Sequence, residues 1–248
     1  MTLGTLVAVV STALLLAGCG EDDKVSTAGD QEAADGAIAA VEQSLRAEGF
    51  SASPDDGGQD DDLAIESEEC RMFRDVIPGG DDRIVPGETA SAQSDLFERG
   101  NPARIADGKG MVESVSASAE FVEDADDLEP LVELMTDKRA VQCFEEALRI
   151  RLEPERSDDQ AAGEIHSVET QQLGSEELGD IGGGFQLTAD ITASGVTAPV
   201  TFVFQFVRVD RALVDVFVVT SSVGYDGPTA DRPALLRVLV DAVSDRST

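Results

Sequence analysis

The order of hydrophobic patterns along the chain predicts an α+β domain: a mostly antiparallel sheet with helices packed on one face. The clearest observation is a succession of four strand-like segments joined by short turns, which favours an antiparallel meander. A pair of helical segments precedes these strands, one further strand lies before that pair, and a single amphipathic helix follows the meander. The chain has 248 residues, of which 42% are hydrophobic, so it can bury one ordinary core.

The first strand is predicted from the strict alternation of residues between positions 114 and 121. Its period of two is typical of a half-buried strand. The alternating sets are Val115, Ala117, Ala119 and Phe121 on one side, and Ser114, Ser116, Ser118 and Glu120 on the other. The preceding stretch, residues 70–110, is rich in Gly, Pro and Asp. For that stretch we expect loops, with a short helical turn over residues 94–98.

Helices are predicted where hydrophobic residues recur every three or four positions. Asp124 can cap a helical pair over residues 125–136 and 138–152. An earlier helix within residues 31–50 ends at Gly49, which suits a left-handed C-cap. The apolar stripes are Ala34, Ile38, Val41 and Leu45 in the early helix, and Val141, Phe144, Leu148 and Leu152 in the second helix of the pair.

The meander is predicted over residues 164–173, 184–193, 198–209 and 212–223, with turns at 179–183, 194–195 and 210–211. On the last two strands, Phe202, Phe204 and Phe206 share one face, and we expect Val214, Val216 and Val218 to cover the same main core. The final helix is predicted over residues 232–246, with its inner side formed by Leu235, Leu236, Leu239 and Val243.

Residues 1–18 are interpreted as a lipoprotein signal peptide. The apolar run is shorter than the roughly 20 residues that cross a bilayer, and it ends in Leu16-Ala17-Gly18-Cys19, the lipobox pattern. It contains no Lys or Arg, unlike most signal peptides. We therefore expect cleavage before Cys19, lipidation of that cysteine, and attachment to the extracytoplasmic face of the cell membrane. An acidic tether over residues 19–30 then leads to a single domain over 31–248, with a polar loop over 54–62.

The two remaining cysteines, Cys70 and Cys143, are expected to form a disulfide, because an even pair in an oxidising compartment favours one. Two unpaired buried thiols are the alternative. A zinc site is not predicted, since zinc takes four convergent ligands at short spacing.

The net charge of −32 excludes a nucleic-acid partner, because such binding depends on Lys and Arg displacing counterions. The acidity indicates solubility or a salty habitat, with a cation-binding surface as the other interpretation.

We assign no catalytic, cofactor-binding or metal-binding residue from the sequence. His166 is the one histidine and is interpreted as structural or exposed. The glycines of 179–184 are followed by a strand, not by the helix that a phosphate cradle needs, so a flexible hairpin is predicted there. The acidic runs 60–62 and 123–127 lack the ligand order of an EF-hand. A hydrolase with paired carboxylates remains an alternative, without residues that mark it.

Several short motifs resemble actinobacterial sensor-domain lipoproteins and, more distantly, the extracellular sensor domain of mycobacterial serine/threonine kinases. They are Val112-Glu113-Ser114-Val115, Phe121, Asp124-Ala125, Cys143-Phe144-Glu145 before Ala147-Leu148, and Phe206-Val207-Arg208-Val209-Asp210-Arg211. The resemblance extends over residues 31–246. The chain departs from it in having Asp210-Arg211 where the family has a Gly-Arg turn, and one cysteine pair where the kinase sensors have two. The resemblance implies a cleft between helices and sheet for a small molecule or lipid, and no catalytic residues.

These observations together favour a non-enzymatic, membrane-anchored binding or sensor-like module with a small apolar ligand. The alternative function is a structural or partner-binding cell-envelope protein without a ligand pocket, which would expose an apolar patch instead.

Overall fold

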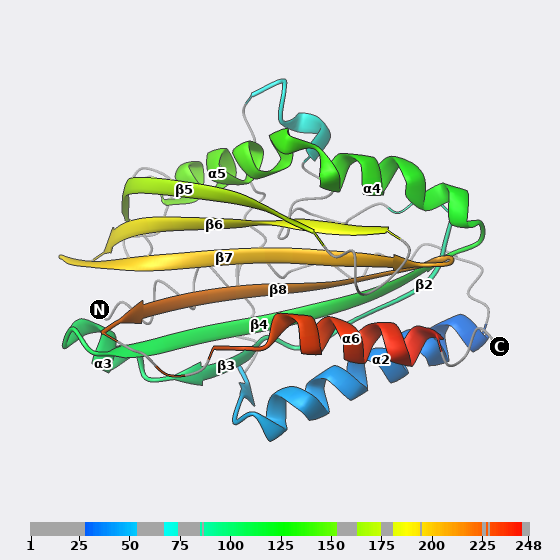
Figure 1. The fold of residues 1–248 in the computed structure, drawn as a ribbon, viewed down its shortest axis with the longest axis horizontal. Helices are drawn as coiled ribbons and strands as arrows, with labels where there is room; N and C mark the ends of the chain where they lie inside the picture. The colour runs from blue at the N-terminus through cyan, green and yellow to red at the C-terminus, as the bar shows by residue number, and fades with distance from the viewer. Residues whose placement is uncertain are drawn as a thin grey trace.

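A computed structural model describes residues 28–53, 67–73, 85, 87–152, 163–174, 181–193, 195–224, 227 and 229–244. These residues form an α+β domain built on an eight-stranded sheet whose strand pairs are all antiparallel (Figure 1), which confirms the predicted fold class. The predicted leader (1–18), Cys19 and the loop 54–62 lie outside the described residues. No helix among the described residues is long and apolar enough to span a membrane.

The long elements follow the predicted order, but the stretch 70–110, predicted as loops with one helical turn, also contains two strands of the sheet and a short helix. The elements are α2 (Ala28–Ala47), β1 (Ser51–Ala52), a 3-10 turn (Arg71–Phe73), β2 (Glu88–Gln93), β3 (Phe97–Gly100), α3 (Pro102–Ala106), β4 (Gly110–Val122), a second 3-10 turn (Ala125–Leu128), α4 (Glu129–Thr136), α5 (Lys138–Leu152), β5 (Glu164–Gly174), β6 (Ile181–Ala193), β7 (Val196–Val209), β8 (Ala212–Val223) and α6 (Arg232–Ser244). The sheet order is β1-β3-β4-β8-β7-β6-β5, so the meander β5–β8 is present as predicted.

Helices cover both faces of the sheet, where the sequence predicted one. One core lies under α4 and α5 and includes Phe202, Phe204 and Phe206. The second core lies under α2 and α6 and includes Val214, Val216 and Val218, so the two triplets do not share a core. Register explains the difference. Phe202 pairs with Val219, so even-numbered residues of β7 share a face with odd-numbered residues of β8. In Figure 1, α4 and α5 run along one side of the sheet, and α2 and α6 lie at the other, near β4.

The polar side of β4, which the alternation predicted to face solvent, is buried. Ser114, Ser116 and Glu120 are 1%, 3% and 7% exposed, and Asp215 of the neighbouring strand is 7% exposed. The Ser118 hydroxyl donates to Asp215 Oδ2 over 2.7 Å, so two members of this polar stripe are paired. The prediction of a half-buried strand fails because helices cover both faces of the sheet: Ser116 pairs with Phe217, which belongs to the core under α4 and α5.

The stretch 94–98 is not the predicted helical turn. It joins β2 to β3, two strands that pair with the same edge of β4. Between them the register slips by one residue, and Ser94 bridges the break. Its N–H donates to the Ala117 carbonyl over 2.9 Å, and its hydroxyl oxygen accepts from the Ala117 N–H over 3.0 Å. The side chain thereby replaces a missing carbonyl of the ladder.

The early helix, α2, is longer than predicted and packs on the domain. It begins by Ala28 and ends before Gly49, whose φ of +88° is the expected left-handed C-cap. Asp30, which the sequence assigned to the tether, is buried in its first turn. The predicted disulfide between Cys70 and Cys143 is present, with a Cα–Cα distance of 5.2 Å, and ties residues 67–73 to α5.

Candidate functional site

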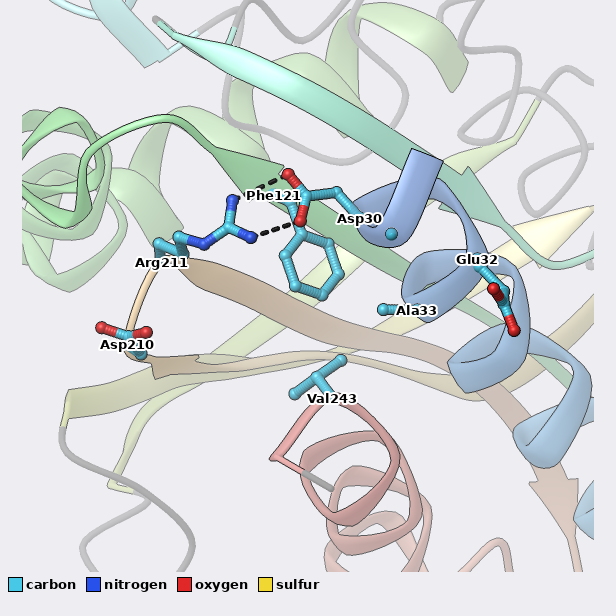
Figure 2. Close-up of a pocket in the computed structure, with 8 residues that line it drawn as sticks. Asp30, Glu32, Ala33, Phe121, Asp210, Arg211 and Val243 are labelled. Carbon is cyan, nitrogen blue, oxygen red and sulfur yellow. Dashed lines mark hydrogen bonds and ion pairs between the residues drawn. The ribbon is translucent and has the colours of Figure 1, made fainter. Parts of the chain in front are cut away.

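The candidate site is a cavity of about 430 Å³ at one end of the α2–α6 layer (Figure 2). Four parts of the fold meet there: the first turns of α2, the end of β4, the last turn of α6 and the β7–β8 turn. The lining residues are Gly29, Asp30, Glu32, Ala33, Phe121, Asp210, Arg211 and Val243.

The wall of the cavity contains an ion pair between residues far apart in the chain. Arg211 Nη1 donates to Asp30 Oδ2 over 2.7 Å, and Arg211 Nη2 donates to Asp30 Oδ1. The Asp30 side chain is only 5% exposed, while that of Arg211 is 37% exposed. The hydroxyl of Thr89 also donates to Asp30 Oδ2, over 2.8 Å. This bidentate pairing of a guanidinium with a carboxylate is the strongest form of such an ion pair. It fixes the first turn of α2 against the sheet.

The guanidinium of Arg211 makes three hydrogen bonds in this arrangement. Besides Asp30, Nη1 donates to the Val122 carbonyl over 3.1 Å. The pKa of Arg211 is raised, chiefly by the hydrogen bonds to Asp30, while partial burial acts in the opposite direction. The group therefore stays charged at any physiological pH.

The β7–β8 turn places Arg211 in this position. Asp210 has a φ of +52°, the left-handed region that Asp tolerates better than most residues. Arg208 Nε donates to the Asp210 carbonyl over 3.2 Å, which holds the turn. Val209 pairs with Ala212, so Asp210 and Arg211 form a two-residue turn between β7 and β8. Arg211 then points towards α2, and Asp210 lies at the rim of the cavity (Figure 2).

The cavity is polar around its rim and apolar at its floor. Phe121, Ala33 and Val243 are buried and belong to the core under α2 and α6. Glu32 and Asp210 are exposed. The arrangement can hold a small molecule by charge and by contact with an aromatic ring, but it offers no long apolar channel of the kind that an acyl chain needs.

Phe121, Asp210 and Arg211, which belong to the motifs of the resemblance, line the cavity, whereas the residues that the sequence weighed for chemistry lie elsewhere. His166 is exposed on β5, where Nε2 lies 2.7 Å from Thr192 Oγ1 and Nδ1 lies 3.8 Å from Glu164 Oε1. Asp124 caps the 3-10 turn by accepting from the Asp126 N–H over 3.1 Å. The Cys70–Cys143 disulfide belongs to the opposite face of the sheet. The histidine, the capping aspartate and the disulfide all lie away from the cavity.

The glycine-rich segment is part of a strand where it is described. β6 begins at Ile181, so Gly182–Gly184 lie in the sheet and not in the predicted hairpin turn. Gly184 has a φ of +156°, and a Cβ there would meet the Phe204 carbonyl oxygen at an impossibly short distance. Gly184 thus allows the close approach of β7 to β6. The acidic run 60–62 lies outside the described residues.

Sequence reasoning missed Asp30 and Arg211 as a site. One signal could have found Asp30: it precedes Ala33, Ala34 and Ala37 at helical spacing, on the stripe that becomes buried. A carboxylate on a buried stripe requires a cationic partner. The resemblance marks Arg211 as part of a turn motif, but nothing local identifies it as the partner of Asp30.

Among the described residues, no group of three or more His, Cys, Asp or Glu side chains could hold a metal ion. The fold and site define an α+β domain with a two-sided antiparallel sheet and an open, polar cavity. No protein-family model matches the chain. Searches of the curated proteins and of the solved structures also gave no significant match.

Proposed function

We propose that this protein is a non-enzymatic binding module, anchored by a lipid on Cys19 to the extracytoplasmic face of the cell membrane, and that the cavity beside the Asp30–Arg211 pair binds a small molecule. The observation that carries the proposal is the cavity itself: it is concave, it combines an apolar floor with polar groups, and one wall is a preorganised ion pair.

Two features of the sequence support the same function. The pattern Leu16-Ala17-Gly18-Cys19 is that of a lipidation site. The resemblance to sensor-domain lipoproteins implies a cleft between helices and sheet, and the departure at Asp210 is conservative in its backbone, since Gly and Asp both accept a φ of +52°.

The lining favours a small polar molecule over the apolar ligand or lipid that the sequence suggested, because charged groups surround the floor on both sides. The alternative function, docking of an envelope protein through an apolar patch, has less support. Ile181 is the one large hydrophobic side chain that the described part of the chain exposes.

The binding function is tested by blocking the cavity. A Cβ at Gly29 would meet nothing within 4 Å, so Gly29→Phe can place a ring at the mouth of the cavity without disturbing the fold. The matched control is Ala39→Phe, which adds the same ring to the exposed side of α2. Native mass spectrometry of the protein purified from its host should show a bound small molecule in the wild type and in Ala39→Phe, and none in Gly29→Phe. The same ligand in all three proteins would contradict the proposed site.

The anchor is tested separately with Cys19→Ser. We expect this variant to leave the membrane fraction, because it lacks the acyl chains whose buried methylenes contribute roughly 0.8 kcal/mol each. A variant that still sediments with membranes would contradict lipidation at Cys19.

A further inference from the structure

We infer that the small molecule of this cavity carries a carboxylate, which the Arg211 guanidinium binds along the edge that Asp30 leaves free. The inference rests on the proposed function and names the class of ligand that the same cavity takes. It is carried by the distribution of hydrogen bonds around Arg211, which leaves one side of the guanidinium available in the cavity.

One edge of the Arg211 guanidinium has no hydrogen-bond acceptor in the described part of the chain. A guanidinium has five N–H groups, and they form two edges that can each donate a parallel pair of hydrogen bonds to a carboxylate. Asp30 takes the edge between Nη1 and Nη2, and the second N–H of Nη1 donates to the Val122 carbonyl. The remaining two groups, the Nε–H and the outer N–H of Nη2, lie side by side and form the other edge, here called the free edge.

The free edge lies in the cavity. Arg211 is one of the lining residues, and 37% of its side chain is exposed. In Figure 2, Asp30 meets the two terminal nitrogens, and the lower side of the guanidinium faces the space between Asp210 and Val243. A carboxylate on the free edge leaves the Asp30 pair in place, so the buried carboxylate of Asp30 keeps its counter-charge. Binding therefore does not require the wall of the cavity to open.

Two carboxylates of the lining, Glu32 and Asp210, oppose a negative ligand. Both residues are exposed to solvent, so their repulsion is screened. The free edge instead makes two charge-assisted hydrogen bonds at direct contact, which are about twice as strong as neutral ones. A singly charged carboxylate suits this cavity better than a phosphate does, because a second negative charge adds repulsion and the free edge has no third N–H group for it.

The floor of the cavity accounts for the rest of the ligand. Phe121, Ala33 and Val243 are buried and provide apolar surface next to the guanidinium (Figure 2). Arg211 Cζ lies 5.7 Å from the centroid of the Phe121 ring, so an apolar body joined to the carboxylate meets this ring. The cavity volume of about 430 Å³ is at the small end of the range of ligand sites, roughly 300–1,000 Å³. We therefore expect a short carboxylic acid with one ring or a branched chain.

Four probes of similar shape test the inference with the full chain in detergent. Phenylacetate, 2-phenylethanol, phenethylamine and benzylphosphonate share one ring and differ in charge. Titrations followed by ¹H–¹⁵N NMR should show phenylacetate binding at least about threefold more tightly than each of the other three. The same spectra report the contact itself. A carboxylate on the free edge should move the Nε–H signal of Arg211 downfield, and 2-phenylethanol should not.

Variants of the two turn residues should act in opposite directions. Asp210→Asn removes an opposing charge and keeps the turn, because Asn also tolerates a φ of +52°. We expect it to strengthen phenylacetate binding about threefold. Arg211→Lys keeps a positive charge beside Asp30 but has no second edge, so phenylacetate should bind about tenfold more weakly, and its spectrum identifies the Arg211 signal by absence. Glu133→Gln, an exposed carboxylate change on α4 at the opposite face, should leave binding unchanged.

Four results would overturn the inference: another probe binding as tightly as phenylacetate, phenylacetate binding without movement of the Nε–H signal, phenylacetate binding that Asp210→Asn does not strengthen, or no binding of any probe. An unchanged affinity in Arg211→Lys, once urea unfolding shows that this variant is folded, would do the same. If Arg211→Lys does not fold, the wild-type spectra and Asp210→Asn decide. If another probe binds best and Gly29→Phe abolishes its binding, the binding function stands and only the ligand class is wrong.

Discussion

Asp30 and Arg211 lie 181 residues apart in the chain and form a two-point ion pair in the wall of the cavity. The pair joins the first turn of the first described helix to the last hairpin of the sheet, and Thr89 of a third element donates to the same carboxylate. One buried carboxylate thereby fixes three separate segments at one end of the domain.

Removing the cation should destabilise the fold. We expect Arg211→Ala to lower the free energy of unfolding by about 2–3 kcal/mol, less than a fully buried pair would lose, since Arg211 is partly exposed. The loss arises because Asp30 keeps its charge but retains only the Thr89 hydroxyl among the three donors described above. Urea unfolding measures the change. Arg237→Ala, an exposed arginine on α6, is the matched control and should change little. Equal losses for the two variants would show that the ion pair has no special role.

The disulfide should stabilise the fold by lowering the conformational entropy of the unfolded chain. It joins residues 73 positions apart, and its loss in Cys143→Ser should lower the free energy of unfolding by about 2–4 kcal/mol. Reductant should bring the wild-type protein to the same value and leave the variant unchanged. A wild-type unfolding curve that does not respond to reductant, although free thiols are detected, would contradict this prediction.

The bulge at Ser94 makes a local prediction. In Ser94→Ala the buried N–H of Ala117 loses its acceptor, which should cost about 1–3 kcal/mol of stability. Hydrogen exchange of the Ala117 amide should accelerate more than that of amides in β7. Ser91→Ala, at an exposed position of β2, serves as the control and should stay within about 0.5 kcal/mol of the wild type.

Asp137 makes a prediction for pH. Hydrogen bonds from the side chain and backbone of Arg139 hold the pKa of Asp137 below its ordinary value. A lowered carboxyl pKa stabilises the fold above the unfolded pKa of about 4, and that contribution is lost as the pH falls through the lowered folded value. Asp137→Asn keeps an oxygen that can accept from the Arg139 N–H but removes the charge.

The stability of the wild type should therefore exceed that of Asp137→Asn near neutral pH, and the two should converge in acid below about pH 4. The effect is small because the pair is exposed to solvent. Urea titrations between pH 2 and pH 7 measure it, and a constant difference over this range would contradict the prediction.

The elements with strong periodicity could be predicted from the sequence. The predicted helix over residues 138–152 is α5, and the predicted strand over 212–223 is β8, because each has an apolar pattern of sufficient length between clear breaks. The short strands β2 and β3 were not predicted. Their sequences, ETASAQ and FERG, carry little alternation, and their pairing with β4 is what makes them strands.

The second layer of helices and the candidate site depend on information that is not local. Phe202 and Val214 lie on opposite faces because of the register between β7 and β8. The hairpin turn sets this register, and the alternation of hydrophobic residues within each strand does not reveal it. Likewise, the sequence around Asp30 does not distinguish it from the other acidic residues of its stretch. Its role becomes visible only in the structure, where it pairs with Arg211. The cavity could be placed only after both faces of the sheet were known.

The pairing of β4 with β8 has a kinetic consequence. Its ladder runs from Gly110 opposite Val223 to Phe121 opposite Ala212, so the centre of the sheet joins segments separated by about a hundred positions. The Asp30–Arg211 pair that anchors α2 cannot form before that end of the ladder exists, because Arg211 lies in the turn before β8. Nearly the entire chain must therefore be synthesised before the native sheet can form. We expect this domain to fold slowly, in roughly milliseconds to seconds, because its contacts are non-local. This order of events is compatible with the proposed export, because the chain would cross the membrane before the centre of its sheet has formed.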